Sequence, residues 1–277
     1  MSFIHQSTCK WFMAASLWIG VLTDSSEAQP PKQITNSIGM KLVLIPKGTL
    51  MMGSPIEEEG RENDEYQHEV TIRKDYYLGV CEVTQSQYDM VIGKNPSFFQ
   101  GEKVGGQNGA LPVERVSWED SVEFCKRLSE FPEEKKSGRV YRLPTEAEWE
   151  HACRAGSKTA FSFDDEPGLL PEYGWFSRNT SDRTHTVGLL EPNAWGLYDM
   201  HGNLWEWCSD WYGEYPKEAI SDPSGPIQGS ARVIRGGGWY SVAANCRSAR
   251  RLGRNPEDRS NRDYGFRVAL STSEIPR

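Results

Sequence analysis

The chain has 277 residues, of which 37% are hydrophobic and 25% charged, and its formal net charge at pH 7 is −8. This acidic balance disfavours nucleic acids and anionic membrane surfaces as partners, because both repel a negatively charged protein. Glycine (26 residues) and proline (16 residues) are frequent and spread out, which favours many turns over long helices. The length fits one large domain or two small ones.

The N-terminus has the pattern of an export signal. Lys10 precedes an apolar run over residues 11–22, which is too short to span a bilayer. Ser26 and Ala28 place small residues at the positions that a signal peptidase requires. We therefore expect residues 1–28 to be a signal peptide, and the mature protein to be periplasmic or secreted and not integral to the membrane. The alternative is an uncleaved N-terminal anchor. Residues 29–35 are predicted to be a linker.

Short strands are predicted in the first third of the mature chain. Apolar segments bounded by turn residues occur at 40–46, 48–53, 68–72 and 76–82. Between the second and third of these segments lies an acidic run over residues 57–65, which is typical of a solvated loop.

Three short helices are expected next, because each has its own start signal. Thr84 and Thr145 begin Thr-x-x-Gln and Thr-x-x-Glu capping boxes, and Ser117 precedes a segment with helical apolar spacing. Gly93 can end the first helix, and the third should extend to about Arg154.

The second half of the chain alternates between irregular segments and strands. Residues 160–193 show no sustained period and predict turn-dominated backbone. Strands are predicted at 232–239, running into a tight glycine turn, and at 264–270. Strands followed by helices and then by further strands indicate the α+β class.

The stretch with the most distinctive chemistry is residues 196–212, which begins Gly-Leu-Tyr-Asp-Met-His-Gly-Asn-Leu-Trp-Glu-Trp. Asp199 and Glu206 bracket a His-Gly-Asn turn, and a hard cation such as calcium prefers carboxylate and carbonyl oxygens on such a loop. The alternative is a buried aromatic strand whose turn is merely capped by these two acids. The spacing alone leaves both interpretations open.

Eight motifs in order resemble the formylglycine-generating enzyme / sulfatase-modifying factor family. They occupy residues 36–40, 52–54, 82–84, 112 with 116–118, 141–149, 196–207, 235–239 and 265–268. The resemblance covers about residues 34–271. It implies one domain over residues 36–271, followed by a tail at 272–277, with a variant of the C-type lectin fold that has many loops and little regular structure.

The resemblance also implies a calcium site in the aromatic stretch. The family's ligands fall on the side chains of Asp199 and Glu206 and on the backbone carbonyls of Gly202 and Leu204. The family's other calcium site is not predicted, because Trp175 stands near the position where its first ligand would be.

The family enzyme oxidises a sulfatase cysteine to formylglycine with molecular oxygen, using two cysteines that bind copper(I). In this chain the first copper position is Ser241, and Gly238 replaces the usual serine of the glycine motif. Cys246 matches the second copper position by count, but its context better matches a cysteine that forms a disulfide in the family. One thiolate does not make a two-coordinate copper(I) site, so we do not expect copper.

The mature chain would keep five cysteines. The resemblance implies a disulfide between Cys153 and Cys246, while the pairing of Cys81, Cys125 and Cys208 stays open. No Cys-x-x-Cys pair occurs, so a zinc site is not expected.

Two functions follow from this comparison of motifs. The first is an exported binding or accessory protein, or one with non-copper chemistry, that uses a groove near Trp205, Trp239 and Ser241 for a peptide, a protein such as an exported sulfatase, or a glycan. The second is a formylglycine-generating oxidase. Arginines between residues 232 and 254 could line the groove or form salt bridges to the many acids, and the sequence leaves both roles open.

Overall fold

The computed structural model describes residue 1 and residues 32–101 and 110–271. The predicted signal peptide, apart from Met1, and the predicted tail lie outside these residues. Within the described part, no helix combines the length and the apolar character needed to cross a bilayer.

A five-stranded antiparallel sheet forms the centre of the domain. Its strand order is β1(Gln33–Thr35), β2(Lys41–Ile45), β5(Tyr76–Gly79), β12(Ala269–Ser271) and β6(Tyr141–Arg142). Because β1 lies within residues 29–35, the domain begins earlier than the predicted linker allowed. Register explains this start, since Ile34 of β1 pairs with Leu42 and both side chains are buried.

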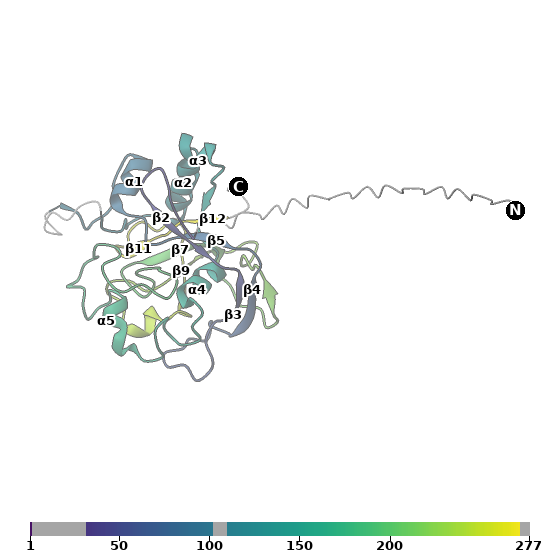
Figure 1. Ribbon diagram of the computed structural model, residues 1–277. Coiled ribbons are helices and arrows are strands. Elements are labelled where there is room, and N and C mark those ends of the chain that lie inside the picture. The colour runs from purple at the N-terminus through teal and green to yellow at the C-terminus, as the bar shows by residue number, and fades with distance from the viewer. Residues whose placement is uncertain (2–31, 102–109, 272–277) are drawn as a thin grey trace.

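The central strand β5 is buried on both faces. Tyr77 points into a cluster with Tyr88 and Phe124, whereas Tyr76 and Leu78 point into a second cluster with Trp149. This alternation is the period of two that a strand imposes. Figure 1 accordingly shows α1, α2 and α3 on one side of the sheet, and α4 with the remaining sheets on the other.

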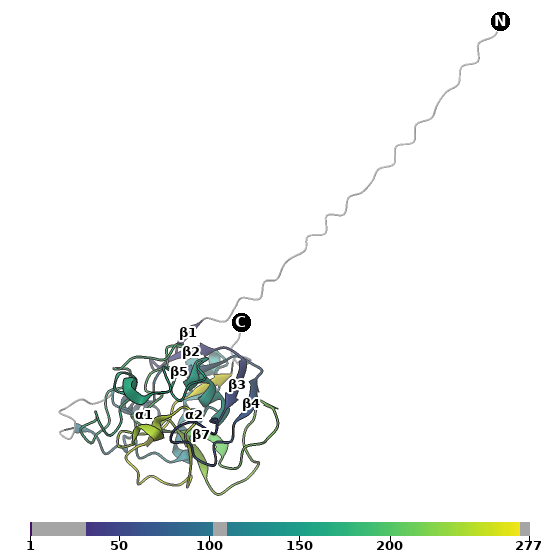
Figure 2. The ribbon, with the colours of Figure 1, turned by 90° about the horizontal axis from the view of Figure 1, so that it is seen from below.

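Two smaller sheets pack against α4, and the larger of them also contributes Trp207 and Ile234 to the cluster that contains Tyr88 and Phe124. One has the order β10(Arg251–Arg254), β9(Arg232–Arg235), β7(Trp205–Trp211) and β11(Tyr264–Gly265). The other has the order β3(Gly48–Met52), β4(His68–Ile72) and β8(Ile220–Ser221), and Figures 1 and 2 both show β3 beside β4. The mixed sheets and short helices confirm the α+β class.

The predicted helix starts are confirmed. The helices α1(Gln85–Ile92), α2(Trp118–Ser129) and α4(Glu146–Arg154) each begin with a capping box, at Thr84, Ser117 and Thr145 respectively. The shorter helices α3(Pro132–Lys136) and α5(Leu170–Tyr173) were not predicted. Each lacks a side-chain cap and starts with a proline at its first or second position.

The prediction of one continuous strand over residues 264–270 is wrong for residues 266–268. The segment is split into β11, which pairs with β7, and β12, which pairs with β5 and β6, so residues 266–268 cross between two sheets. Arg267 lies at this crossing and is fully buried. Its Nε and Nη2 donate to both carboxylate oxygens of Glu206 at 2.6 Å, and its remaining N–H groups bond the carbonyls of Gly79 and Tyr198.

The other arginines of the C-terminal third also turn inward. Arg235 pairs with Glu150, Arg251 with Glu146, and Arg247 with Glu58 and Glu65. The structure thereby selects the salt-bridge role for these three side chains. The structure also corrects the prediction that residues 57–65 form a solvated loop, because Glu65 is fully buried in its ion pair.

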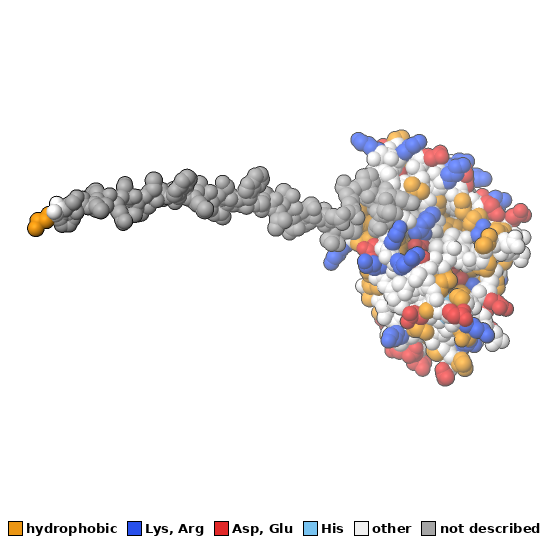
Figure 3. All heavy atoms as spheres, turned by 90° about the vertical axis from the view of Figure 1, so that its right-hand side faces the viewer, with side chains coloured by type: hydrophobic (Ala, Val, Ile, Leu, Met, Phe, Trp, Pro, Cys, Tyr) orange, Lys and Arg blue, Asp and Glu red, His pale blue; other side chains and the backbone are white. Residues whose placement is uncertain are grey.

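Charges are dispersed over the face of the molecule that Figure 3 shows. Figure 3 shows basic, acidic and apolar side chains interspersed over the face at the right of Figure 1. Exposed pairs such as Arg127 with Glu123, one turn apart on α2, contribute little to stability.

We predict that Arg267→Met lowers the free energy of unfolding by about 3–5 kcal/mol, because it leaves the Glu206 carboxylate buried without its countercharge. The matched control Arg127→Met removes an exposed pair and should change stability by less than about 0.5 kcal/mol. Urea unfolding followed by tryptophan fluorescence measures both. Equal, small losses in the two variants would show that the buried pair is dispensable.

Candidate functional site at the glycine turn

The glycine turn follows β9 and packs against the loop that leads into β7. Gly237 has a φ of 80°, and a Cβ built there would lie 2.7 Å from Sγ of Cys246. A larger residue at this position would therefore meet both backbone strain and a clash. The turn brings residues 238–241 beside Trp205 and Asp263.

Ser241 is part of this turn rather than of an open surface. Its Oγ accepts a hydrogen bond from the Gly238 amide at 2.9 Å, and its own amide donates to the Gly238 carbonyl at 2.9 Å. The side chain is buried. The hydroxyl therefore stabilises the turn from the position at which the family's first copper cysteine would stand.

Gly238 leaves room for the carboxyl group of Asp263, a residue that was not predicted from the sequence to belong to the site. A Cβ at Gly238 would lie 3.0 Å from Oδ2 of Asp263 and 3.1 Å from Cδ1 of Trp205. The Asp263 carboxyl thus borders the space that a serine side chain would need. Asp263 belongs to no motif recognised in the sequence, and it directly precedes β11.

The Asp263 carboxyl is buried, and neither of its oxygens has a hydrogen-bond partner among the described residues. The nearby Tyr240 hydroxyl favours the ionised form without reaching hydrogen-bonding geometry. Burial outweighs this effect and raises the pKa of Asp263 to about 7. The candidate site therefore holds a carboxyl group that titrates near neutral pH.

The predicted groove residues meet around Gly238, but only one of them reaches the surface. Trp205 is 3% exposed and Ser241 is 4% exposed. Trp239 is partly exposed; its Nε1 donates to the Arg262 carbonyl at 3.0 Å, and its ring packs edge-on against Phe99. Tyr240, which is 48% exposed, packs against the Trp239 ring. The accessible part of the site is therefore the Trp239–Tyr240 pair.

The predicted disulfide between Cys153 and Cys246 is not formed in the structure, where both residues are free thiols. The imidazole of His201 contacts both residues, with Cys153 Sγ 3.8 Å from Nε2 and with Nδ1 donating to the Cys246 carbonyl at 2.8 Å. Burial raises the pKa of Cys153 to about 12 and lowers the pKa of His201 to about 4, so thiol and imidazole both stay neutral. Burial likewise raises the pKa of Cys246.

In the loop predicted to bind calcium, other groups of the protein already bind most of the side-chain oxygens of Asp199 and Glu206. Arg267 binds both carboxylate oxygens of Glu206, and Trp149 Nε1 also donates to Oε2 of the same carboxylate. Asp199 accepts from the Gly188 amide through Oδ2, whereas its buried Oδ1 has no partner among the described residues. Burial raises the pKa of Asp199 to about 6.

Glu82 is a further carboxylate at this loop, and it was not predicted from the sequence to lie there. It accepts from the Asn203 side chain and from the Leu204 amide, and its pKa is raised, first by burial and then by Asp199 and Glu206. Gly202 is required for the same packing, because a Cβ there would lie 2.2 Å from the Trp175 carbonyl. The residues fit calcium only in part, because Asp199 Oδ1 has no partner among the described residues, whereas Arg267 binds both oxygens of Glu206.

We predict that Asp263→Asn flattens the pH dependence of stability. The folded-state pKa of about 7 lies above the unfolded value of about 3.9, so the native protein loses stability as pH rises through this window. Between pH 5 and pH 8 the parent protein should lose about 3 kcal/mol more than the variant.

Chemical denaturation at both pH values measures this difference. The control is Asp182→Asn, an exposed position with a φ of 57° that asparagine tolerates, and it should keep the parent's pH profile. Parallel profiles for the parent and Asp263→Asn would contradict the assignment.

Comparison with known proteins places the chain among proteins that share this fold. The family model of the sulfatase-modifying factor enzyme 1-like domain matches residues 27–272. The chaperone protein LppX of Paenibacillus barcinonensis is 31% identical over 242 residues, which cover 71% of this chain and 80% of LppX. The formylglycine-generating enzyme of Streptomyces coelicolor is 35% identical over 176 residues, but only 57% of this chain and 52% of that enzyme are covered.

Solved structures agree with the family match. Treponema denticola variable protein 1 superposes with a TM-score of 0.78 at 30% identity, covering 87% of this chain and all of that chain. PvdO from Pseudomonas aeruginosa gives a TM-score of 0.76 at 28% identity, covering 88% of this chain and all of that chain.

Proposed function

Because the chain belongs to the sulfatase-modifying factor enzyme 1-like family, we propose that it is an exported binding or accessory member that engages a peptide or protein without copper chemistry. The proposed contact surface is the Trp239–Tyr240 pair at the glycine turn. Exposed aromatic pairs of this kind supply large contact areas at low entropic cost.

The observation that supports this proposal is the donor set at the turn. Two-coordinate copper(I) requires two soft thiolates. Ser241 places a hydroxyl at one position, and that hydroxyl is already bonded to Gly238. Cys246 is fully buried with a raised pKa, and its sulfur lies against the Val242 carbonyl at 3.8 Å. Neither position supplies an accessible thiolate.

The relatives are compatible with more than one role. LppX is called a chaperone, which supports a function in binding a protein, whereas the Streptomyces coelicolor protein is named as an enzyme. A formylglycine-generating oxidase is therefore the second candidate. Its chemistry would have to proceed with Ser241 and Gly238 in place of the family's cysteine and serine.

The two candidates differ in one measurable product. We predict that a Cys-x-Pro-x-Arg sulfatase peptide is recovered unchanged after incubation with the copper-treated protein and a reductant in air. Mass spectrometry would detect the exchange of the thiol for an aldehyde. A copper-loaded enzyme with the family's cysteine pair is the positive control, and aldehyde formation by this chain would overturn the proposal in favour of the oxidase.

We propose in addition that calcium binds the loop through the side chains of Asp199 and Glu206 and the carbonyls of Gly202 and Leu204. The unpartnered Asp199 Oδ1 supports this, and the cation would neutralise a carboxyl group that burial keeps partly protonated.

We expect millimolar calcium to raise the melting temperature relative to EDTA, because a ligand that binds only the native state stabilises it. The shift should vanish in Asp199→Ala and persist in the surface control Asp182→Asn. Melting curves that are identical in calcium and in EDTA would rule the site out.

A further inference from the structure

A cavity of about 600 Å³ lies apart from the glycine turn, between the start of α4, the strands β4 and β7, and the segment 213–226. We call it the 213–226 cavity. Its lining includes His68, Glu146, Asp210, Tyr215 and Arg251, and none of the residues of the glycine turn or the calcium loop. It is therefore separate from the surface proposed above, and ligand binding in this cavity does not depend on that surface.

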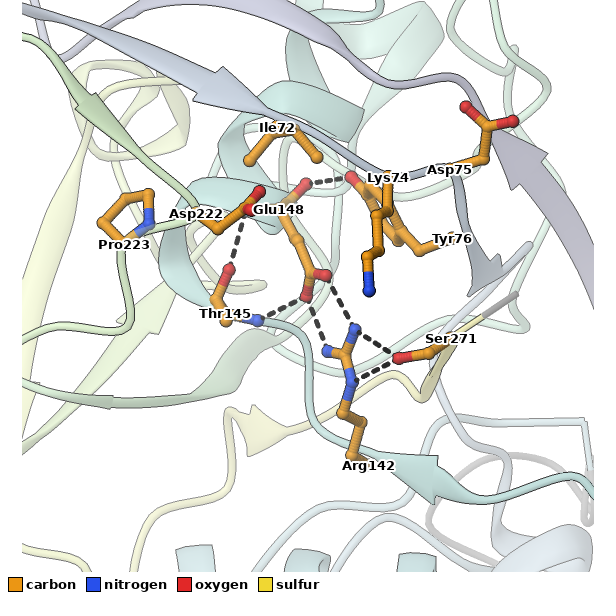
Figure 4. Close-up of a pocket in the computed structure, with 10 residues that line it drawn as sticks. All are labelled: Ile72, Lys74, Asp75, Tyr76, Arg142, Thr145, Glu148, Asp222, Pro223 and Ser271. Atoms are coloured by element: carbon orange, nitrogen blue, oxygen red, sulfur yellow. Dashed lines mark hydrogen bonds and ion pairs between the residues drawn. The ribbon is translucent and has the colours of Figure 1, made fainter. Parts of the chain in front are cut away.

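A smaller neighbouring pocket of about 160 Å³ provides a contrast (Figure 4). It shares Asp222 and Pro223 with the 213–226 cavity. Arg142 and Glu148 in this pocket form an ion pair, because Arg142 donates to both carboxylate oxygens of Glu148 at 2.6 and 2.7 Å. This pocket offers no unused carboxylate comparable to the one in the larger cavity.

Asp210 supplies that carboxylate. It lies on β7, is 3% exposed and lines the 213–226 cavity. Its Oδ2 accepts from the Glu146 amide at the start of α4 and from the Ser209 hydroxyl, both at 2.9 Å. Its Oδ1 makes no hydrogen bond or ion pair with a described residue. One carboxylate oxygen is thus fixed by the fold and the other is left for a ligand.

His68 contributes a second acceptor to the same cavity. Its Nδ1 lies 3.1 Å from the Tyr66 carbonyl, which can only accept, so Nδ1 carries the proton. In the neutral ring Nε2 is then an acceptor. The ring is held against Tyr215, with the two centroids 4.9 Å apart.

The guanidinium and phenol donors around these acceptors, on Arg251 and Tyr215, are already used. Arg251 donates to both carboxylate oxygens of Glu146 and to the Gly213 carbonyl. The Tyr215 hydroxyl donates to Glu146 at 2.8 Å. The charged lining is otherwise acidic, with Glu214 at the exposed rim. A ligand that complements this cavity must therefore bring hydrogen-bond donors and positive charge.

We propose that the 213–226 cavity binds an organic cation with an ammonium or guanidinium group, held by Oδ1 of Asp210 and Nε2 of His68. The cation is either a small free amine or guanidine, or the end of a lysine or arginine side chain of another protein. Burial, followed by the charge of Glu146, raises the pKa of Asp210 to about 7, so a bound cation would favour its ionised form.

The test uses methylguanidinium and n-butylammonium as small probes and the blocked peptide Ala-Arg-Ala as the side-chain probe, at constant ionic strength and pH 8. Urea serves as the uncharged counterpart of guanidinium. Two-dimensional NMR follows the Trp211 indole N–H and the Gly213 and Gly225 amides, which belong to residues that line the cavity. We expect saturable shifts of these signals with a cationic probe and none with urea.

The decisive variant is Asp210→Asn, whose carbonyl oxygen can still accept from Glu146 and Ser209 while the charge is lost. We expect at least about a tenfold loss of affinity. The rim control Glu214→Gln should bind within about twofold of the parent. Stronger binding of the peptide than of the small probes would identify a protein side chain as the source, and the reverse would identify a free metabolite.

Three results would overturn the proposal: no saturable shift in the parent protein, shifts confined to signals outside the cavity, or equal binding by Asp210→Asn. Should Asp210→Asn fail to fold, as judged by its NMR dispersion, the location of the shifts in the parent protein decides the matter. His68→Gln, which can still donate to the Tyr66 carbonyl, then serves as the second variant and should also weaken binding.

Discussion

The buried pair of Arg267 and Glu206 is the interaction on which the domain depends. The guanidinium group lies where the chain leaves the four-stranded sheet and enters the five-stranded one, and the carboxylate lies on β7. The same arginine bonds carbonyls of β5 and of the loop before β7. With 26 glycines and few long helices, the fold relies on such fixed polar links to hold its loops in place.

The same principle explains why the glycine turn stays ordered without the family's usual residues. Ser241 closes the turn through the Gly238 amide, and Gly238 leaves room for the Asp263 carboxyl. Each departure from the family motif thus has a structural partner. The turn, the neutral thiols around His201 and the Trp239–Tyr240 surface form a consistent arrangement, and the proposed binding role rests on it.

The sequence predicted what is locally encoded. The three capping boxes fixed the starts of α1, α2 and α4, because each Thr or Ser side chain satisfies an amide three residues away. It did not predict the split of the last strand, the burial of Glu65 or the position of Asp263. These depend on partners more than 20 residues away, such as Arg247 for Glu65, which no local pattern reports. The motif comparison marked Asp199 and Glu206, but it did not predict that Arg267 binds both carboxylate oxygens of Glu206.

The proposed binding role rests on the absence from the glycine turn of a thiolate pair able to hold copper(I). Its most direct test is a copper(I) titration of the reduced protein in competition with a chromophoric chelator such as bicinchoninate. We expect the chelator to keep the copper, and Cys246→Ser to give the same curve as the parent. Stoichiometric transfer of copper(I) to the parent protein that is abolished by Cys246→Ser would contradict the claim.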